Sequence, residues 1–380
     1  MELTKIKRVF SVVLFLVILL IFGIWLNRVE KTEILETEGR TFEKARVVAI
    51  NKDNLLSDGS RAGTQDVDVE IRTGAHKGEI LSASSSSSYL YGADCTVGLK
   101  VIVIISECEG NISVSVYNYD RGAQLYMILA VFLIILGIIG GKKGWKSALG
   151  LVFTFVCIVY FFLPMVYRGI SPIWAAVFIV VLITVVVMYL IDGTSVKSLC
   201  AMAGTVLGVG IAALLACLFA RISHITGYNV DDIENLIYIG QMTGIQVGEL
   251  MFAGILISAL GAVMDVAMSV ASTINEIHEK KPELSVNELF QSGINVGRDM
   301  MGTMSNTLIL AFAGGSLNTL IYIYSYRYNY YQVINMYAIG IEIIQGISAT
   351  FGVILTVPLV SVIASVGMKK GDLGSRESDS

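Results

Sequence analysis

The chain has 380 residues, of which 54% are hydrophobic and only 15% charged, and its formal net charge at pH 7 is -4. Soluble domains carry about 25% charged residues, so this composition and the mean hydropathy of +0.71 exclude a soluble protein and predict a polytopic membrane protein. The near-neutral charge argues against a nucleic-acid partner, which requires a basic face.

The first hydrophobic stretch, residues 9–26, has no charged residue and is long enough to span a bilayer. It follows a basic segment that contains Lys5, Lys7 and Arg8. No A-x-A-like cleavage site follows the stretch, which argues against a secretory signal peptide. We therefore interpret residues 1–26 as an uncleaved N-terminal anchor helix.

Residues 27–124 are the one sizeable water-soluble region. Apolar and polar residues alternate over 66–72 and 111–117, which is typical of half-buried strands, and further strands are expected near 45–50 and 100–106. We predict a small β-barrel or sandwich, with an oligomer-binding (OB) barrel as one form. It has no nucleophile motif and no phosphate loop, so a structural or partner-docking role is the default.

Two details of this region are predicted separately. The serine-rich run 84–88 is expected to be a flexible hairpin tip. Cys95 and Cys108 could form a disulfide if the region is extracytoplasmic, and the sequence leaves that open.

Seven more hydrophobic segments follow, which gives eight predicted spanning helices. They are residues 125–140, 148–166, 173–191, 199–220, 250–270, 307–324 and 339–366. Together they make a predicted seven-helix membrane domain, residues 125–370, followed by a disordered cytoplasmic tail, residues 371–380.

The distribution of basic residues predicts the orientation. Most of them fall on one side of the predicted spans: Lys142, Lys143, Lys146, Lys197, Lys280, Lys281, Arg298, Lys369 and Lys370. Only Arg168, Arg221 and Arg327 fall opposite. By the positive-inside rule, both termini are expected in the cytoplasm and the β domain outside a bacterial cell membrane.

Two connections are longer than the others. Residues 223–248 are expected outside, with a short amphipathic helix from about Asp231 onward that lies on the membrane. Residues 275–306 are expected inside, with a helix that begins at the N-cap Ser285, whose capping-box partner is Glu288. We expect this segment to form an interfacial elbow that presents Arg298 and Asp299 to the cytoplasmic mouth.

Three runs in the second half of the chain resemble the YibE/F-like family of bacterial multi-spanning membrane proteins. They are GAVMDVAMS at 261–269, GRDMMGTMSNTLILA at 297–311 and GGSL at 314–317. The resemblance extends over most of the chain, including the anchor and the β domain, and implies a form in which two halves that also occur separately are fused. It implies no catalytic residues.

Asp265 is the sharpest single feature, because it lies within an apolar segment. It follows Glu249 by sixteen positions, which is about 24 Å along a helix. An ionised carboxylate at that depth costs several kcal/mol unless it is paired, hydrated or protonated. Asp265 is either a proton or cation site, with Arg298 and Asp299 nearby on the same path, or a structural group in a salt bridge, for which Arg298 is a candidate.

The next predicted span contains an interruption, Gly314 and Gly315. Polar residues flank or occupy this span: Asn306, Thr307, Ser316 and Asn318. A helix broken there would expose backbone groups that coordinate ions, as in secondary transporters. The alternative is that the glycine pair permits the close approach of a neighbouring helix.

No motif supports an enzyme. The chain lacks an H-E-x-x-H zinc pair, a G-x-S-x-G elbow and a Walker lysine, and its three histidines have no ligand spacing, so no metal, cofactor or catalytic residue is expected. The preferred hypothesis is a transporter or permease for an ion or small solute, with Asp265 as the coupling residue. The alternative is a membrane scaffold whose β domain docks an envelope partner; the bilayer and a homo-oligomer are further candidate partners. An intramembrane acid pair of Asp265 and Asp299 is a third hypothesis, and it requires that both reach one cavity.

Overall fold

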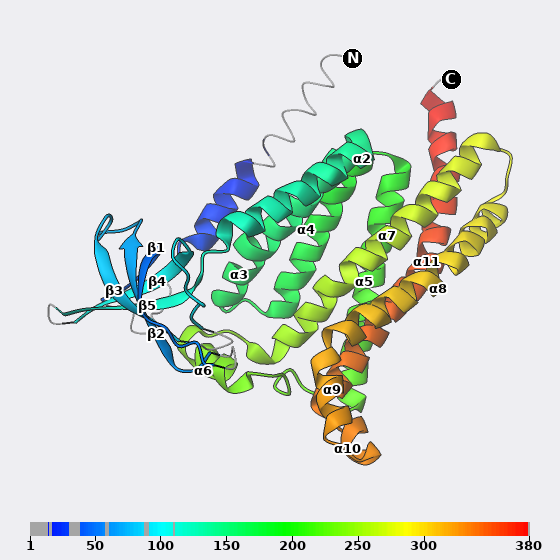
Figure 1. Ribbon diagram of the computed structural model, residues 1–380. Coiled ribbons are helices and arrows are strands. Elements are labelled where there is room, and N and C mark those ends of the chain that lie inside the picture. Colours follow the sequence, from blue (N-terminus) through cyan, green and yellow to red (C-terminus); the bar gives the residue numbers. More distant parts are fainter. Residues whose placement is uncertain are drawn as a thin grey trace. The chain divides into compact units, whose positions relative to one another are not determined.

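The structure, a computed structural model, describes residues 14, 17–29, 39–57, 61–86, 91–108 and 111–378, without the side chains of 370–378. The chain divides into two compact units (Figure 1). One is Glu33–Ile135, and the other joins Met1–Thr32 to Leu136–Ser380. The predicted anchor, residues 9–26, lies partly outside the described residues.

The first unit contains a closed five-stranded barrel. Its strands are β1 (Arg40–Lys52), β2 (Thr64–Ile71), β3 (Ile80–Ser86), β4 (Lys100–Cys108) and β5 (Asn111–Tyr119). The strand order is β1-β2-β3-β5-β4, with β1 antiparallel to both β2 and β4, and β3 parallel to β5. This is the order of the Greek-key OB barrel, so of the two predicted forms the barrel is confirmed. The four expected strands are present, and β3 is additional.

Alternation along the strands builds the barrel core. In β2, Val67, Val69 and Ile71 are fully buried, whereas the acidic residues between them are partly exposed. The prediction of a flexible hairpin tip is wrong for residues 84–86, because they belong to β3. Residues 87 and 88 lie outside the described part. Ser85 is buried, and its hydroxyl donates to the Ala93 carbonyl at 2.7 Å and accepts from the Ala93 amide at 3.0 Å.

The two cysteines of the barrel are unpaired in this structure. Cys95 is buried in the barrel core, and Cys108 is exposed at the end of β4.

The second unit is helical. Five helical segments of the described chain are long and apolar enough to cross a membrane, and a bent pair makes a sixth. The five are Gly122–Tyr167, Pro172–Asp192 (α4), Val196–Ile222 (α5), Val247–Lys280 and Tyr337–Lys369. The bent pair is α8 (Val286–Gly315) with α9 (Leu317–Ser325). A shorter apolar helix, Val17–Asn27, precedes them. Eight separate spans were predicted. Gly122–Tyr167 contains two of them, and the predicted anchor is described only as the short helix Val17–Asn27.

The longest segment is broken at Gly141. It consists of α2 (Gly122–Cys157), the π-helical turn η1 (Ile158–Phe162) and α3 (Leu163–Tyr167). Gly141 has φ 56° and ψ -138°, outside the helical region. A side chain at Gly144 would lie 2.2 Å from the carbonyl oxygen of Leu136, although eight residues of straight helix would separate them by about 12 Å. The chain therefore turns sharply at Gly141, between the two segments that the sequence predicts here.

Small residues bring α5 and α11 (Tyr337–Ser378) close together. A Cβ at Gly204 would lie 2.1 Å from Val360, and one at Gly208 would lie 1.9 Å from the hydroxyl of Thr356. The antiparallel register that these pairs define continues at Gly352, where a Cβ would lie 2.8 Å from Ala212. Figure 1 shows α5 and α11 beside α7 (Leu250–Lys280), whose buried face carries Val263, so these three helices form the centre of the unit.

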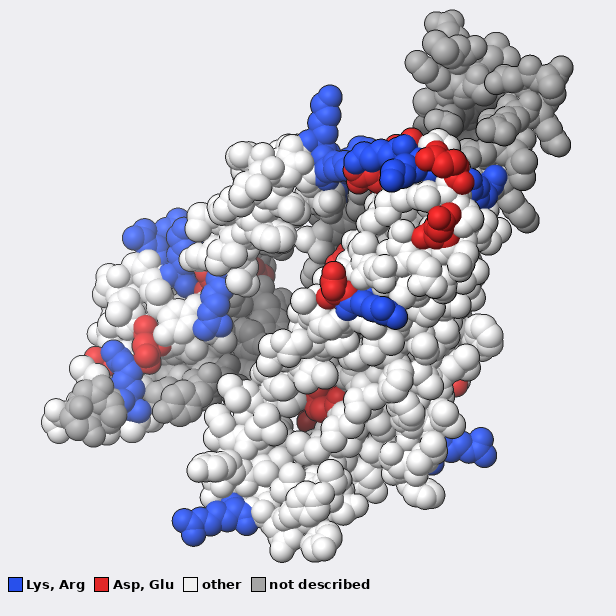
Figure 2. Space-filling view, turned by 90° about the vertical axis from the view of Figure 1, so that its right-hand side faces the viewer, with Lys and Arg blue, Asp and Glu red and all other residues white. Residues whose placement is uncertain are grey.

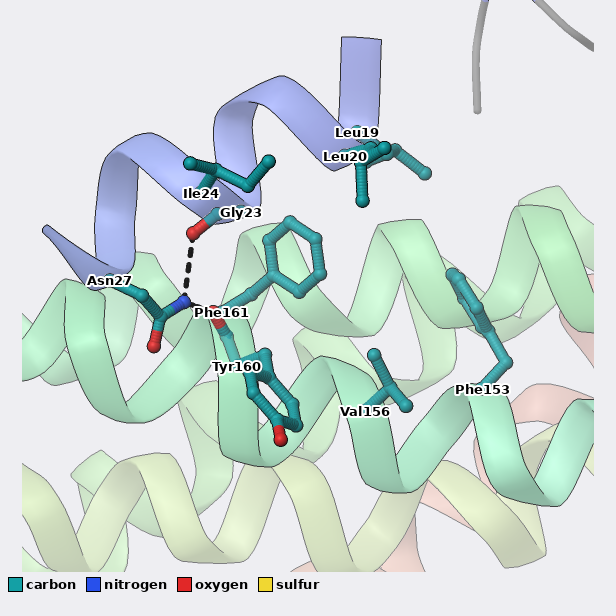
Figure 3. Close-up of a pocket in the computed structure, with 9 residues that line it drawn as sticks. All are labelled: Leu19, Leu20, Gly23, Ile24, Asn27, Phe153, Val156, Tyr160 and Phe161. Carbon is teal, nitrogen blue, oxygen red and sulfur yellow. Dashed lines mark hydrogen bonds between the residues drawn. The ribbon is translucent and has the colours of Figure 1, made fainter. Parts of the chain in front are cut away.

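The described N-terminal helix is fixed to this unit at its C-terminal end. The Asn27 amide donates to the carbonyls of Gly23 at 2.8 Å and of Tyr160, in η1, at 2.9 Å (Figure 3). The Arg168 guanidinium donates to carbonyls at the end of this helix, those of Trp25, Leu26 and Arg28. It also lies 4.3 Å from the centre of the Trp25 ring. An apolar pocket of about 530 Å³ separates this helix from Phe153 and Val156 of α2.

Charged side chains gather at one end of the helical unit. Figure 2 shows Lys, Arg, Asp and Glu side by side there and a mostly white surface below, with only scattered charged groups. The contacts agree, because Lys369 donates to the carbonyl of Pro282 at 2.5 Å and Lys197 pairs with Asp192 at 3.3 Å. The predicted clustering of lysines at one end is present; α9 and α10 (Tyr330–Ile334) lie at the opposite end (Figure 1).

Three further predictions can be compared with the structure. The expected short helix after Asp231 is α6 (Ile233–Thr243), preceding η2 (Val247–Glu249), and the capping box of Ser285 and Glu288 begins α8. The prediction of a disordered tail from residue 371 is wrong as far as Ser378, because α11 continues to that residue.

Candidate functional site

One side of α7 faces outward from the helical unit and carries Asp265. The buried side of this helix includes Leu256, Val263, Val266 and Val270. Small or polar exposed residues recur at helical spacing on the other side: Gly254, Ser258, Gly261 and Asp265. Asp265 forms no ion pair and no hydrogen bond with any residue that the structure describes. A salt bridge to Arg298, one of the predicted roles of Asp265, is thus not formed in this structure.

The neighbouring helix α8 is also polar on its outward side. Its inward side packs through Leu289, Gly293, Gly297 and Met304. Exposed polar residues or glycines occupy the other side: Asn295, Arg298, Asp299, Gly302, Thr303 and Asn306. The predicted interfacial elbow is wrong, because α8 is one continuous helix from Val286 to Gly315, so Arg298 and Asp299 lie three to four turns into it.

The contacts between α7 and α8 show which residues lie level with Asp265. A Cβ at Gly293 would lie 2.7 Å from Ile274, and Leu308 packs against the cluster of Ala212, Ala259 and Ala349. In this antiparallel register, Asp265 lies level with Gly302, and Arg298 and Asn306 lie about one turn to either side. We call Asp265, Arg298, Asp299 and Asn306 the polar face.

None of the four side chains of the polar face has a hydrogen-bond or ion-pair partner within the described chain. Asp265 lies in the apolar span of α7, whereas α8 is polar in its first half, with Glu288 and Gln291, and is a candidate span only together with α9. A charged group within a bilayer requires a counter-charge, water or another protein. The structure therefore brings together four of the nine predicted site residues on one surface that needs a polar neighbour.

The remaining predicted residues lie at or near the break between α8 and α9. α8 ends at Gly315, Ser316 separates the helices, and their axes differ by 61°. A Cβ at Gly314 or Gly315 would meet no atom within 4 Å, so close packing does not explain this pair within the described chain; a glycine pair is a common position for a kink. Asn318 is exposed, and the Thr307 hydroxyl donates to the Thr303 carbonyl at 2.9 Å.

Glu342 also belongs to this region, although it is not among the predicted site residues. It lies in the second turn of α11 and lines a pocket together with Ser316. Its position within the predicted span 339–366 could have marked Glu342 as a candidate site residue. The cost of an ionised carboxylate in an apolar segment, which singled out Asp265, applies to any acid in such a segment.

A family model described as YibE/F-like protein matches residues 128–370. The chain belongs to the YibE/F-like family. No curated protein and no solved structure matches it. The match to the YibE/F-like family begins in α2 and ends in α11, so it contains the polar face, the α8–α9 break and Glu342. The barrel and the N-terminal helix lie outside the match, although the resemblance in the sequence was expected to extend to both.

Proposed function

We propose that this member of the YibE/F-like family is a transporter or permease for an ion or small solute, and that the polar face lines its path. The observation that carries the proposal is the set of unpartnered side chains on α7 and α8, with Asp265 midway along the apolar span of α7. Asp265 lies sixteen residues from Glu249 and fifteen from Lys280, so neither end of α7 is within about 20 Å of its backbone along the helix.

The proposed topology has eight spans and both termini in the cytoplasm of a bacterial cell. The break at Gly141 supports two spans in Gly122–Tyr167, and the bent α8–α9 pair counts as one. With Val17–Asn27 as part of the first span, α4, α5, α7 and α11 complete eight. The lysine-rich end would then face the cytoplasm, and the barrel would lie outside.

A transport path along the polar face would require hydration or a second protein surface. Arg298 and Asp299 carry opposite charges one residue apart, and small residues near Asp265 permit the close approach of another helix. A second copy could therefore cover the face, with Arg298 of each copy near an acid of the other. In this proposal the α8–α9 break forms the end of the path away from the lysine-rich end.

The test is proton and cation flux in proteoliposomes that contain the full chain. Asp265→Asn should reduce flux about tenfold or more, because it removes the charge that couples to the ion. Glu276→Gln is the matched control, since Glu276 lies on α7 three turns beyond Asp265 and pairs with Lys280 at 2.8 Å outside the apolar segment. The control should retain wild-type flux.

The scaffold hypothesis predicts the opposite pattern. If wild-type protein carries no flux across a broad ion screen and Asp265→Asn is silent in cells, the transporter proposal fails. Loss of function on deletion of residues 27–124, with Asp265→Asn unchanged, would then identify the barrel as the partner-docking part.

A further inference from the structure

The break between α8 and α9 faces the first turns of α11 across a pocket of about 360 Å³. Most of its wall is apolar, formed by side chains such as Ile309, Phe312 and Ile343. Only two lining residues have side chains with oxygen atoms, Ser316 at the break and Glu342 on α11. The pocket therefore presents one carboxylate and one hydroxyl in apolar surroundings.

Glu342 is poorly compensated. Its Oε2 atom is shut off from solvent and has no hydrogen-bond partner within the described chain. An ionised carboxylate in apolar surroundings costs several kcal/mol unless a positive charge or several donors compensate it. No Lys, Arg or His lines this pocket. The Glu342 carboxylate thus lacks a compensating positive charge.

The Ser316 hydroxyl can accept a cation as a neutral oxygen ligand. The Ser316 amide and hydroxyl both bond to the Phe312 carbonyl, at 3.1 and 3.2 Å, so the hydroxyl proton is engaged and its lone pairs stay available to a cation. The last turn of a helix also leaves carbonyl groups without helical partners, and the negative end of the helix dipole favours a cation there.

We propose that Glu342 and Ser316 bind a monovalent metal cation of the Na⁺ class at the α8–α9 break. A single carboxylate with a neutral hydroxyl oxygen in the same pocket matches one positive charge, and oxygen ligands at a broken helix are the usual Na⁺ site of secondary transporters. A role of this site in transport rests on the proposed function, in which Na⁺ would be the transported or the coupling ion. Cation binding itself is measurable without transport.

The experiment is a thermal-unfolding titration of the full chain in detergent with NaCl, against choline chloride at equal ionic strength. A cation that binds only the folded protein raises the Tm saturably. The wild type should show this rise with Na⁺ and not with choline. Glu342→Gln should abolish it, Ser316→Ala should weaken the Na⁺ affinity about tenfold, and the control Glu276→Gln should not change it.

A second measurement does not depend on the stability of the variants. A hydrophobic carbodiimide modifies protonated carboxyl groups in apolar surroundings, and mass spectrometry identifies the residue. Modification of Glu342 in wild-type protein should be slowed about tenfold by saturating Na⁺, because a bound cation displaces the proton. Modification that depends on pH alone, or a Tm rise that persists in Glu342→Gln, would overturn the site.

The site and the transporter can fail separately. Flux that Asp265→Asn abolishes, in a protein whose Tm does not respond to Na⁺, would retain the transporter and remove the Glu342 site. Saturable Na⁺ binding without any flux would retain the site and remove the transporter.

Discussion

At the scale of single residues, hydroxyl groups and charged groups within the apolar helices differ in how they are satisfied. Some buried hydroxyls bond to the carbonyl one turn earlier, as Thr205 does to Ala201 at 2.9 Å and Thr356 to Gly352 at 2.7 Å. This bond needs no other helix. Four other hydroxyl oxygens are buried without a partner in the described chain, those of Ser198, Ser348, Thr350 and Ser361. Asp265, Arg298 and Glu342 also have no local partner among the described residues. An unpaired charge in apolar surroundings costs far more than an unpaired hydroxyl, which makes charged residues the better indicators of function here.

His76 makes the barrel sensitive to pH. Its ring nitrogens lie 2.8 Å from Glu107 and 2.9 Å from Glu79, and these hydrogen bonds, that to Glu107 first, raise the pKa of His76. The protonated ring is the form that both carboxylates bind. Its contribution to stability is therefore fully present below the unfolded pKa of about 6.5 and is lost as pH rises through the higher folded pKa.

We expect hydrogen-exchange protection of β4, corrected for the intrinsic rate, to fall as pH rises from 6 to about 8.5. The His76→Gln variant should be less protected at low pH and should lose this dependence. The same pH dependence in His76→Gln would assign the effect to another group.

At the scale of elements, small residues determine which helices pack closely. A Cβ at Gly208 would lie 1.9 Å from Thr356 and 2.9 Å from Val263, whereas one at Gly210, half a turn away on α5, would meet no atom within 4 Å. The G-x-x-x-G pattern of Gly204 and Gly208 is common by chance in glycine-rich membrane chains. Here it marks the contact of α5 with α11.

Gly208→Val should therefore lower the free energy of unfolding by about 1–3 kcal/mol, the usual effect of overpacking. Gly210→Val should change it little. Thermal unfolding of the two variants in the same detergent measures the difference, and equal losses would show that α5 and α11 do not approach as described.

At the scale of the whole molecule, the proposed topology can be tested with the native cysteines. Cys108 is exposed on the barrel and Cys95 is buried in it, while burial raises the pKa of the Cys95 thiol and so lowers its reactivity. A membrane-impermeant maleimide should label Cys108 in intact cells, since the barrel is proposed to lie outside.

Cys108→Ser should abolish that labelling. A cysteine introduced at Lys280, at the lysine-rich end, should react only after the cells are permeabilised. Labelling with the reverse pattern would invert the proposed orientation and put the barrel in the cytoplasm.

The sequence alone predicted the class of the protein, four of the five strands and the segments that form the membrane helices, because hydrophobic length and alternation are local properties of the chain. β3 was missed, since its serines have the composition of a loop, and only Ser85, which bonds to Ala93, is buried. The short helix α6 and the capping box of α8 were also predicted from local pattern.

The tertiary structure alone decided which residues share a surface. Asp265 and Arg298 are 33 positions apart in the chain, and only the antiparallel register of α7 and α8 brings them to within about one turn of the same level. Glu342 and Ser316 line one pocket because α11 returns beside the broken α8–α9 pair. The hydrophobic pattern of a sequence describes one helix at a time. Which side chains become neighbours depends on how helices that are distant in the sequence pack, and contacts such as that of Gly208 with Thr356 determine this packing.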